Sequence, residues 1–342
     1  MQIASVTGFF GITFVVSLFA SAVAYAFVFN QNKKAFLWSS AVSVIIILLC
    51  LGYGWARIYS IRTEASDHVQ VGLAAINVPA AEAHDPKLAS NFVSQYQPLI
   101  QNLAQEKASI ILLPEKALTL NPTNQSQIMN QLSALALDNH VVLIVGVSEF
   151  KNGEHFNTAW LFNTQGALIG EYHKHHLVPG FESDMTAGTK LLNFPIDPDK
   201  AGVEICRDMD YIHPALEYGT EQSGILFVPA EDFNIDAFVH NQDAFIHGIE
   251  NGYTVVRNAR SGLLSVTSAS GEILGQALNI TAGQSSTLLV NAPISTKNSF
   301  YSRHPYGFIG LLSFLLMGLI GQILLGRFFF KNQISKSSYS TQ

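Results

Sequence analysis

Three long segments without a charged residue constrain this chain more than any other feature. Residues 7–29, 35–56 and 306–326 are each long enough to cross a hydrocarbon core of about 30 Å as a helix. The mean hydropathy of +0.24, with only 13% charged residues, is too apolar for a purely soluble protein. The first segment lacks the basic start of a signal peptide, and another apolar segment follows it closely. The sequence therefore predicts three retained transmembrane helices.

The distribution of basic residues predicts the orientation of these helices. Lys33 and Lys34 lie between the first two segments, and three further basic residues, beginning with Arg327, follow the third. Basic residues beside short spans stay on the cytoplasmic side. We therefore expect a multi-pass protein of the cytoplasmic (inner) membrane. Two helices lie in residues 1–64, a polar domain in 65–297 faces the outer or periplasmic side, and the last helix with a short tail occupies 298–342.

Charge and cysteine content exclude several classes of protein. The net charge is −6 and no basic stripe is interleaved with aromatic residues, so the sequence predicts no nucleic-acid partner. The two cysteines are Cys50, inside an apolar segment, and Cys206, in the polar domain, which rules out a disulfide framework within that domain. Nothing in the sequence predicts the oligomeric state.

The polar domain alternates short apolar runs with helical stretches, the pattern of an α/β fold. Strands are expected in "VQVGLAAINV", "ASIILLPE", "HVVLIVGVSEF", "AGVEIC", "GILFVPA", "YTVVRNA", "GLLSVTS" and "STLLVNA". A hairpin of two further strands is expected around "TQG", the second strand being "ALIGEYHK". Amphipathic helices are expected near residues 86–107 and 126–138, in "PALEYGTEQ", and in "AFVHNQDAFIHGIENG". These repeated units favour one domain over several small ones.

Three chemically reactive side chains stand at the ends of expected strands: Glu115, Lys174 and Cys206. Polar groups at the C-terminal ends of such strands converge on a crevice. A thiol becomes nucleophilic when a base removes its proton, a carboxylate can be that base, and a fixed ammonium can stabilise an oxyanion. Each residue alone also fits an ordinary role, as a buried cysteine, a helix cap or a solvated lysine.

The three surrounding motifs together resemble those of the carbon–nitrogen hydrolase (nitrilase) superfamily. "LLPEKAL", "GEYHKHHLVPGFE" and "GVEICRDMDYIHPAL" follow the family's order of Glu, Lys and Cys. Within that superfamily, the last part of the second motif and "IENGYTVVRNARSGLLSVTSASGEILG" look most similar to the apolipoprotein N-acyltransferases. The resemblance implies an αββα sandwich flanked by transmembrane helices, a cysteine acyl-enzyme and no cofactor.

The resemblance also implies further site residues and exposes differences from the acyltransferases. Glu182 in "PGFES" matches a second glutamate of the family and would orient Lys174 or the acceptor. Arg207 and Asp208 replace the usual Tyr and Glu after the cysteine, and Phe233 stands where the family has a tryptophan. Asp208 and Phe233 are candidate substrate-binding residues, although Asp208 equally fits a structural role at a helix start.

The sequence supports three hypotheses for function. In the first, a membrane-anchored carbon–nitrogen hydrolase cleaves a small amide through a thioester on Cys206; the shortened membrane part and missing tryptophans favour it. In the second, an N-acyltransferase moves a fatty acyl group from membrane phospholipid to an amine such as a lipoprotein N-terminus; the flanking spans favour it. In the third, the domain is a catalytically silent, membrane-tethered binding module.

The histidines around Lys174 also raise the question of a metal site. His173, His175 and His176 lie within four residues. Side chains alternate along a strand, so His173 and His175 share one face while His176 shares the other with Lys174. Three ligands on one ion would require the strand to break. The sequence therefore predicts no metal site here, and the histidines are interpreted as the packing and hydrogen-bonding frame of Lys174.

Overall fold

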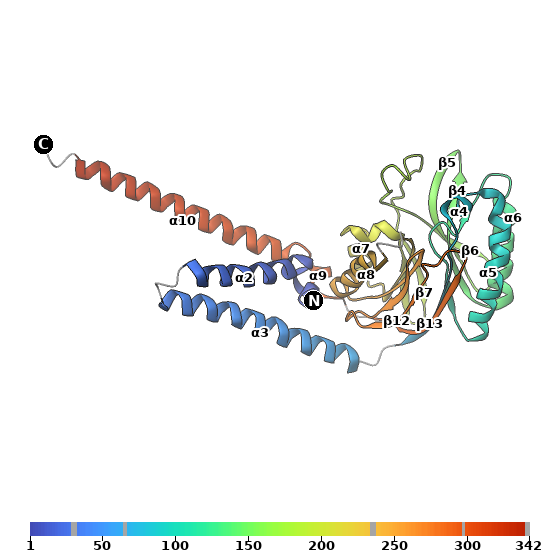
Figure 1. Ribbon diagram of the computed structural model, residues 1–342, viewed down its shortest axis with the longest axis horizontal. Coiled ribbons are helices and arrows are strands. Elements are labelled where there is room, and N and C mark those ends of the chain that lie inside the picture. The colour runs from blue at the N-terminus through green and yellow to red at the C-terminus, as the bar shows by residue number, and fades with distance from the viewer. Residues whose placement is uncertain (29–32, 64–66, 233–236, 296–297, 339–342) are drawn as a thin grey trace.

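A layered α/β domain carries three long helices that project from one side of it (Figure 1). The computed structural model describes residues 1–28, 33–63, 67–232, 237–295 and 298–338. The helices are α1 Ala4–Thr7, α2 Phe9–Val28, α3 Lys33–Thr63, α4 Ala80–Ala83, η1 Pro86–Leu88, α5 Ala89–Gln105, α6 Gln125–Asn139, η2 Cys206–Asp210, α7 Ala215–Thr220, α8 Ala237–Asn251, α9 Phe300–Arg303 and α10 Gly307–Ser338, η1 and η2 being 3₁₀ helices.

Two sheets form the centre of the domain. The first has the order β13-β1-β2-β4-β5-β6, with β3 paired to β4, and the second has the order β12-β11-β10-β9-β8-β7. Neighbours β1, β2 and β4 run parallel, as do β8, β9 and β10, while the outer strands are antiparallel. The strands are β1 His68–Ile76, β2 Ile110–Leu112, β3 Leu118–Thr119, β4 Val142–Lys151, β5 Glu154–Phe162, β6 Leu168–His173, β7 Leu192–Ile196, β8 Asp199–Val203, β9 Ile225–Glu231, β10 Thr254–Arg260, β11 Leu263–Thr267, β12 Ile273–Leu278 and β13 Ser285–Pro293.

The apolar core is divided among three layers. One cluster, which includes Leu73, Leu161 and Phe227, fills the space between the two sheets. A second, which includes Trp160, packs the outer face of the first sheet against α5 and α6, and a third packs the second sheet against α7 and α8. Strands buried on both faces are near-continuous apolar runs, as in "IIL" and "ILFVPAE". The predicted αββα arrangement is confirmed.

The sequence located most elements but overlooked weakly patterned strands. The helices near residues 86–107 and 126–138 correspond to η1 with α5 and to α6, and α8 ends before Gly252, whose φ is +88°. Strands β3, β7 and β12 were not expected. Both β7 and β12 lie at the edges of the second sheet and lack the continuous apolar run of an interior strand. Strand β7 contains Pro195, whose missing N–H is tolerated at an edge, and β12 has no buried residue.

Two of the three expected membrane helices meet the length and hydropathy needed to cross a membrane. They are Phe36–Thr63 within α3 and Gly307–Leu325 within α10, and their side chains are almost entirely unburied by the protein. The third, Phe9–Tyr25 within α2, is a shorter apolar helix among the described residues. Gly8, with φ of +65°, separates α1 from α2, and residues 29–32 at the other end of the expected span lie outside the described part of the chain.

Helix α3 continues past its apolar segment and contacts the domain through two arginines. Arg57 donates hydrogen bonds to the carbonyl oxygens of Ile249, at 3.2 Å, and Ala269, at 3.1 Å. Arg62 forms a two-point ion pair with Glu272, with N–O distances of 3.0 and 3.1 Å. A cavity of about 480 Å³ lies at this junction. Arg57 and Arg62 thus attach the end of α3 to the domain.

Candidate active site

Glu115, Lys174 and Cys206 come from both sheets and meet at one end of the sandwich. Glu115 follows β2, Lys174 directly follows β6, and Cys206 begins η2 after β8. The turn that carries Glu115 approaches β4 closely, because a Cβ added at Gly146 would lie 2.3 Å from the Pro114 carbonyl oxygen. The short strand and this glycine together let Glu115 turn inward, where its side chain is only 2% exposed.

Lys174 lies between two carboxylates and joins them. Its Nζ donates to Glu115 Oε1 at 2.7 Å and to Glu182 Oε2 at 3.0 Å. All three side chains are at most 2% exposed. Burial alone would lower the pKa of Lys174, but the carboxylates of Glu115 and Glu182 outweigh it and raise the pKa, so the ammonium is retained. The structure thus brings together three of the residues that the sequence proposed.

Two further residues complete this network and were not expected from the sequence. Asn157 on β5 donates from Nδ2 to Glu115 Oε1 at 2.6 Å and to Glu182 Oε1 at 2.7 Å, and its carbonyl accepts the Lys174 N–H at 2.9 Å. Lys116 reaches Glu182 Oε1 at 3.2 Å. Asn157 interrupts the apolar run "HFNTAWLF", and this pattern could have identified it from the sequence.

The surrounding hydrogen-bond donors keep the Glu182 side chain ionised. Burial acts to raise its pKa, whereas Lys174, Lys116 and the Val178 N–H, which donates to Oε2 at 2.8 Å, lower it, and the net effect is a lowered pKa. Glu182 therefore supplies one negative charge to balance two buried ammonium groups. Its position beside Lys174 supports the orienting role expected from the family resemblance.

Cys206 occupies a strained turn beside the network. Its φ of +44° lies in the left-handed region that non-glycine residues rarely adopt. Its Sγ lies 3.6 Å from the Glu231 carbonyl oxygen. Burial raises the pKa of the thiol, and Glu115 raises it further, while Lys174 and Arg257 act in the opposite direction. The net effect is a raised pKa, so the resting thiol is protonated and needs a base to become a nucleophile.

Asp208 organises the turn of Cys206 and the chain after Lys174. Its carboxylate is fully buried and accepts hydrogen bonds from the Tyr172 hydroxyl at 2.7 Å, the His176 N–H at 2.8 Å and the Ile205 N–H at 3.2 Å. A carboxylate with these protein donors supports the structural alternative and argues against direct contact with substrate. The other candidate for substrate binding, Phe233, lies outside the described residues.

The histidines at the end of β6 and directly after it turn to different partners. His176 Nδ1 lies 3.1 Å from Asp208 Oδ1, and its ring stacks on Tyr211. His175 Nε2 faces the Lys190 carbonyl oxygen at 3.3 Å. His173 points to the opposite face of the first sheet, toward Glu149 and Glu171. These three histidines do not converge on one centre.

Buried arginine pairs border the cysteine on the side of β9 and β10. Arg257 forms a two-point ion pair with Asp232, with N–O distances of 2.8 and 2.6 Å. Arg260 is paired with Glu231, whose second oxygen lies 3.6 Å from Lys116 Nζ. Arg257 lowers the pKa of the Cys206 thiol and its partner Asp232 raises it, and the sequence motifs did not indicate either ion pair.

The chain belongs to the carbon–nitrogen hydrolase family. The model of that family matches residues 74–287, which are more than half of the chain. The match includes Glu115, Lys174, Cys206 and the strands that position them. The resemblance inferred from the three motifs is thus confirmed.

Among curated proteins, the chain is similar to several apolipoprotein N-acyltransferases. That of Geobacter metallireducens is 22% identical, with 89% of this chain and 63% of the relative covered. That of Haemophilus influenzae is 24% identical, with 94% and 67% covered. The chain therefore spans about two thirds of the length of these relatives, somewhat less for the first.

Among solved structures, the domain is similar to an amidase from Nesterenkonia sp. One structure of it aligns with a TM-score of 0.58 and 16% identity, covering 70% of this chain and 94% of the amidase. Another, of a mutant amidase in complex with butyramide, aligns with a TM-score of 0.57 and 15% identity, covering 67% and 92%. At this identity the likeness establishes the nitrilase-type fold alone.

Proposed function

We propose that this protein is a membrane-anchored N-acyltransferase that works through a thioester on Cys206. One observation carries the proposal: the similarity to apolipoprotein N-acyltransferases covers 89% and 94% of the chain, beyond residues 74–287 and into the flanking helices. The amidase structures cover 67–70% of the chain. The relatives thus favour the acyltransferase hypothesis over amide hydrolysis, which the sequence had placed first.

In the first half of the proposed reaction, Glu115 removes the proton from the Cys206 thiol. The thiolate attacks the carbonyl carbon of a phospholipid acyl ester, and Lys174 stabilises the resulting oxyanion. The tetrahedral intermediate collapses as its carbon–oxygen bond to the glycerol breaks, and Glu115 returns its proton to the leaving oxygen. The products are a lysophospholipid and an acyl thioester on Cys206. The raised pKa of the thiol supports the need for Glu115 as the base.

In the second half, an amine such as a lipoprotein N-terminus attacks the thioester carbon. Glu115 accepts a proton from the amine, the carbon–sulfur bond breaks, and the proton passes to the sulfur, so the thiol is restored and an amide is released. With a small amide as the acyl donor and water in place of the acceptor amine, the same steps give the hydrolase hypothesis, which the amidase fold keeps as the second candidate. Glu182 and Asn157 act as positioning residues, because Glu182 contacts Lys174, Asn157 contacts Glu115, and both side chains are buried.

We also propose where the protein is located and how it is oriented. We place it in the cytoplasmic membrane with α2, α3 and α10 as spans and the domain of residues 65–297 on the outer side. The hydropathy of α3 and α10 supports the spans, and Lys33, Lys34 and the basic residues after α10 support the orientation. Arg57 and Arg62 are basic residues on the opposite side, and their contacts with the domain offer a reason for their presence there.

Cysteine labelling tests this orientation. In a chain with Cys50→Ser and Cys206→Ser, we expect Asn152→Cys, in the exposed β4–β5 turn, to react with a membrane-impermeant maleimide in intact spheroplasts. Lys34→Cys should react only after permeabilisation. The reverse labelling pattern would refute the orientation.

The catalytic proposal is tested by following the mass of the peptide that contains Cys206. Detergent-purified full-length protein is incubated with phospholipid, or with a panel of short amides, and digested. We expect a long-chain acyl adduct on Cys206 that disappears when a short amine-bearing lipopeptide is added, with formation of its N-acyl product. Cys50→Ser is the matched control, since Cys50 lies in α3, and it should acylate normally, whereas Cys206→Ala should not.

The same experiment separates the three hypotheses. Ammonia release from an amide without a lipid-derived adduct would support the hydrolase and refute the acyltransferase. Identical behaviour of wild type and Cys206→Ala under all these conditions would leave the silent binding module.

A further inference from the structure

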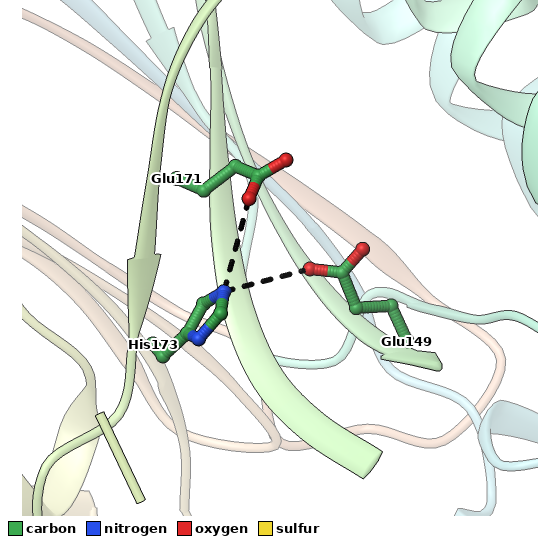
Figure 2. A group of neighbouring side chains, drawn as sticks. All are labelled: Glu149, Glu171 and His173. Atoms are coloured by element: carbon green, nitrogen blue, oxygen red, sulfur yellow. Dashed lines mark ion pairs between the residues drawn. The ribbon is translucent and has the colours of Figure 1, made fainter. Parts of the chain in front are cut away.

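Two carboxylates and an imidazole meet on the outer face of the first sheet, opposite the Lys174 network. Glu149 lies near the end of β4, and Glu171 and His173 lie two residues apart on β6, with β5 between the two strands. His173 Nε2 is 4.0 Å from Glu149 Oε1 and 3.8 Å from Glu171 Oε2. Figure 2 shows this nitrogen pointing at both carboxylates, and one ligand atom from each residue lies within 4.8 Å of the others.

The state of Glu149 is a second, independent observation. Its side chain is 1% exposed, and Oε1, the oxygen that faces His173, makes no hydrogen bond, although Thr158 and Trp160 lie close enough to the carboxyl group to lower its pKa. The other oxygen accepts a bond from Gln125 Nε2 at 3.1 Å.

A buried carboxylate oxygen without a hydrogen bond is destabilising unless a proton or a cation neutralises it. Burial raises the pKa of Glu149, and a bound cation would instead keep this carboxyl group ionised. Lys151, which pairs with Glu171, is the neighbouring cation, so two carboxylates share one ammonium when His173 is neutral.

We propose that Glu149, Glu171 and His173 bind a divalent metal ion, with Zn²⁺ as the best match. Mixed imidazole and carboxylate ligands suit Zn²⁺, whose bonds to both are about 2.1 Å. A tetrahedral ion with such bonds holds its ligand atoms roughly 3.4 Å apart, so the 3.8 and 4.0 Å separations need to shrink by only about half an ångström. His173 and Glu171 are 22% and 24% exposed, which gives the ion a path from solvent.

The ion would act on structure and would not touch the reacting thiol. It would join β4 to β6 across β5 at the residue that immediately precedes Lys174. This strand end is already tightly packed, because a Cβ added at Gly188 would lie 2.1 Å from the His173 carbonyl oxygen. Binding would therefore fix the end of β6, and with it the backbone from which Lys174 extends.

The sequence prediction of no metal site considered the three histidines as a set. That set does not converge in the structure, and the proposed ligands are different. Glu171 and His173 have the two-residue spacing that places side chains on one face of a strand. The third ligand, Glu149, is brought to them only by the sheet topology.

Zinc binding to the full-length protein tests the proposal. Protein without a polyhistidine tag, carrying Cys50→Ser and Cys206→Ser so that no thiol competes, is purified in detergent, stripped with a chelator and titrated with Zn²⁺ by calorimetry. Metal bound per chain is measured after gel filtration. We expect one Zn²⁺ per chain, weaker binding of Mg²⁺, and a midpoint of thermal unfolding that rises with Zn²⁺ concentration.

Matched variants identify the ligands. Glu149→Gln and His173→Gln should each weaken Zn²⁺ binding at least tenfold and remove the thermal shift. The control is His240→Gln, from a more exposed group of Asp210, His240 and Asp243 that also has metal-like spacing; it should bind as the parent does. Without metal, Glu149→Gln should unfold at the parent's temperature or above, because it removes a buried charge, and this verifies that it folds.

Several results would overturn the proposal. They are the absence of stoichiometric binding to the parent protein, binding that survives in both Glu149→Gln and His173→Gln, and binding that is lost in His240→Gln. Because the readouts are metal content and thermal stability, failure of the acyltransferase proposal would leave this test unaffected.

Discussion

The two faces of the first sheet at the end of β6 handle buried charge in different ways. On the inner face, Glu115 and Glu182 each accept hydrogen bonds from Lys174 and from Asn157. On the outer face, the equally buried Glu149 has one oxygen without a donor. Two consecutive residues, His173 and Lys174, therefore serve two sites of opposite character, because side chains alternate along a strand.

This difference separates a site that supplies its own cations from one with an unpaired carboxylate oxygen, which the proposed metal ion would neutralise. The inner network contains its own ammonium groups, so its geometry is fixed before substrate arrives, as stabilisation of an oxyanion requires. The outer group has fewer cations than carboxylates and is more open to solvent. Substitutions that remove one charge from either face test this difference.

The largest effect is expected for Lys174→Met. It leaves Glu115 and Glu182 buried against each other, with Lys116 as the neighbouring ammonium, and removing one partner of a buried ion pair costs about 3–5 kcal/mol. We expect a midpoint of thermal unfolding many degrees lower and no detectable acyl adduct on Cys206. If this variant were as stable as the wild type, the ion pairs of Lys174 with Glu115 and Glu182 would not stabilise the fold.

A smaller effect is expected for Asn157→Leu. Leucine keeps the volume but removes the donor shared by Glu115 and Glu182, and a lost hydrogen bond to a buried group costs about 1–3 kcal/mol. The rate of thioester formation should fall, because Glu115 and Lys174 lose a fixed neighbour. Asn139→Leu is the control, since its Nδ2 bonds only a helix carbonyl, that of Leu135; it should acylate at the normal rate.

The convergence of Glu115, Lys174 and Cys206 could be inferred from the sequence because each of them follows an expected strand. Polar groups at strand ends meet at one edge of an α/β fold. Glu182 came from the family resemblance, and the structure brings it to Lys174. The assignment of catalytic roles stays a prediction until the cysteine adduct is measured.

Contacts that cross several strands could not be inferred in this way. The order of β4, β5, β9 and β10 in the two sheets brings three groups to these sites: Asn157, the Arg257–Asp232 pair and Glu149. The relatives also reverse the order of the first two function hypotheses. The missing tryptophans favoured hydrolysis, whereas the extent of similarity along the flanking helices favours acyl transfer.

A third effect concerns pH and Glu182. Its pKa is lowered in the folded protein, mainly because Lys174 and Lys116 outweigh its burial. A carboxyl group with a lowered pKa adds stability above its unfolded value, about 4.3, and this stability is lost as the pH falls through the folded value. We expect the unfolding midpoint of the wild type to fall below about pH 4.3, and the fall to be shallower in Glu182→Gln. Glu106→Gln, on the exposed end of α5, should retain the steep wild-type profile.

The smallest effect is expected for Lys151→Met on the outer face. Lys151 is 44% exposed, and exposed ion pairs contribute roughly 0.2–1 kcal/mol. Unlike Lys174→Met, this variant should unfold within a few degrees of the wild type and acylate Cys206 normally. Because Lys151 competes with a metal ion for Glu171, its removal should tighten Zn²⁺ binding measured by calorimetry. Weaker binding would mean that Lys151 supports the arrangement of Glu171, and that the outer face, like the inner one, depends on its own ammonium group.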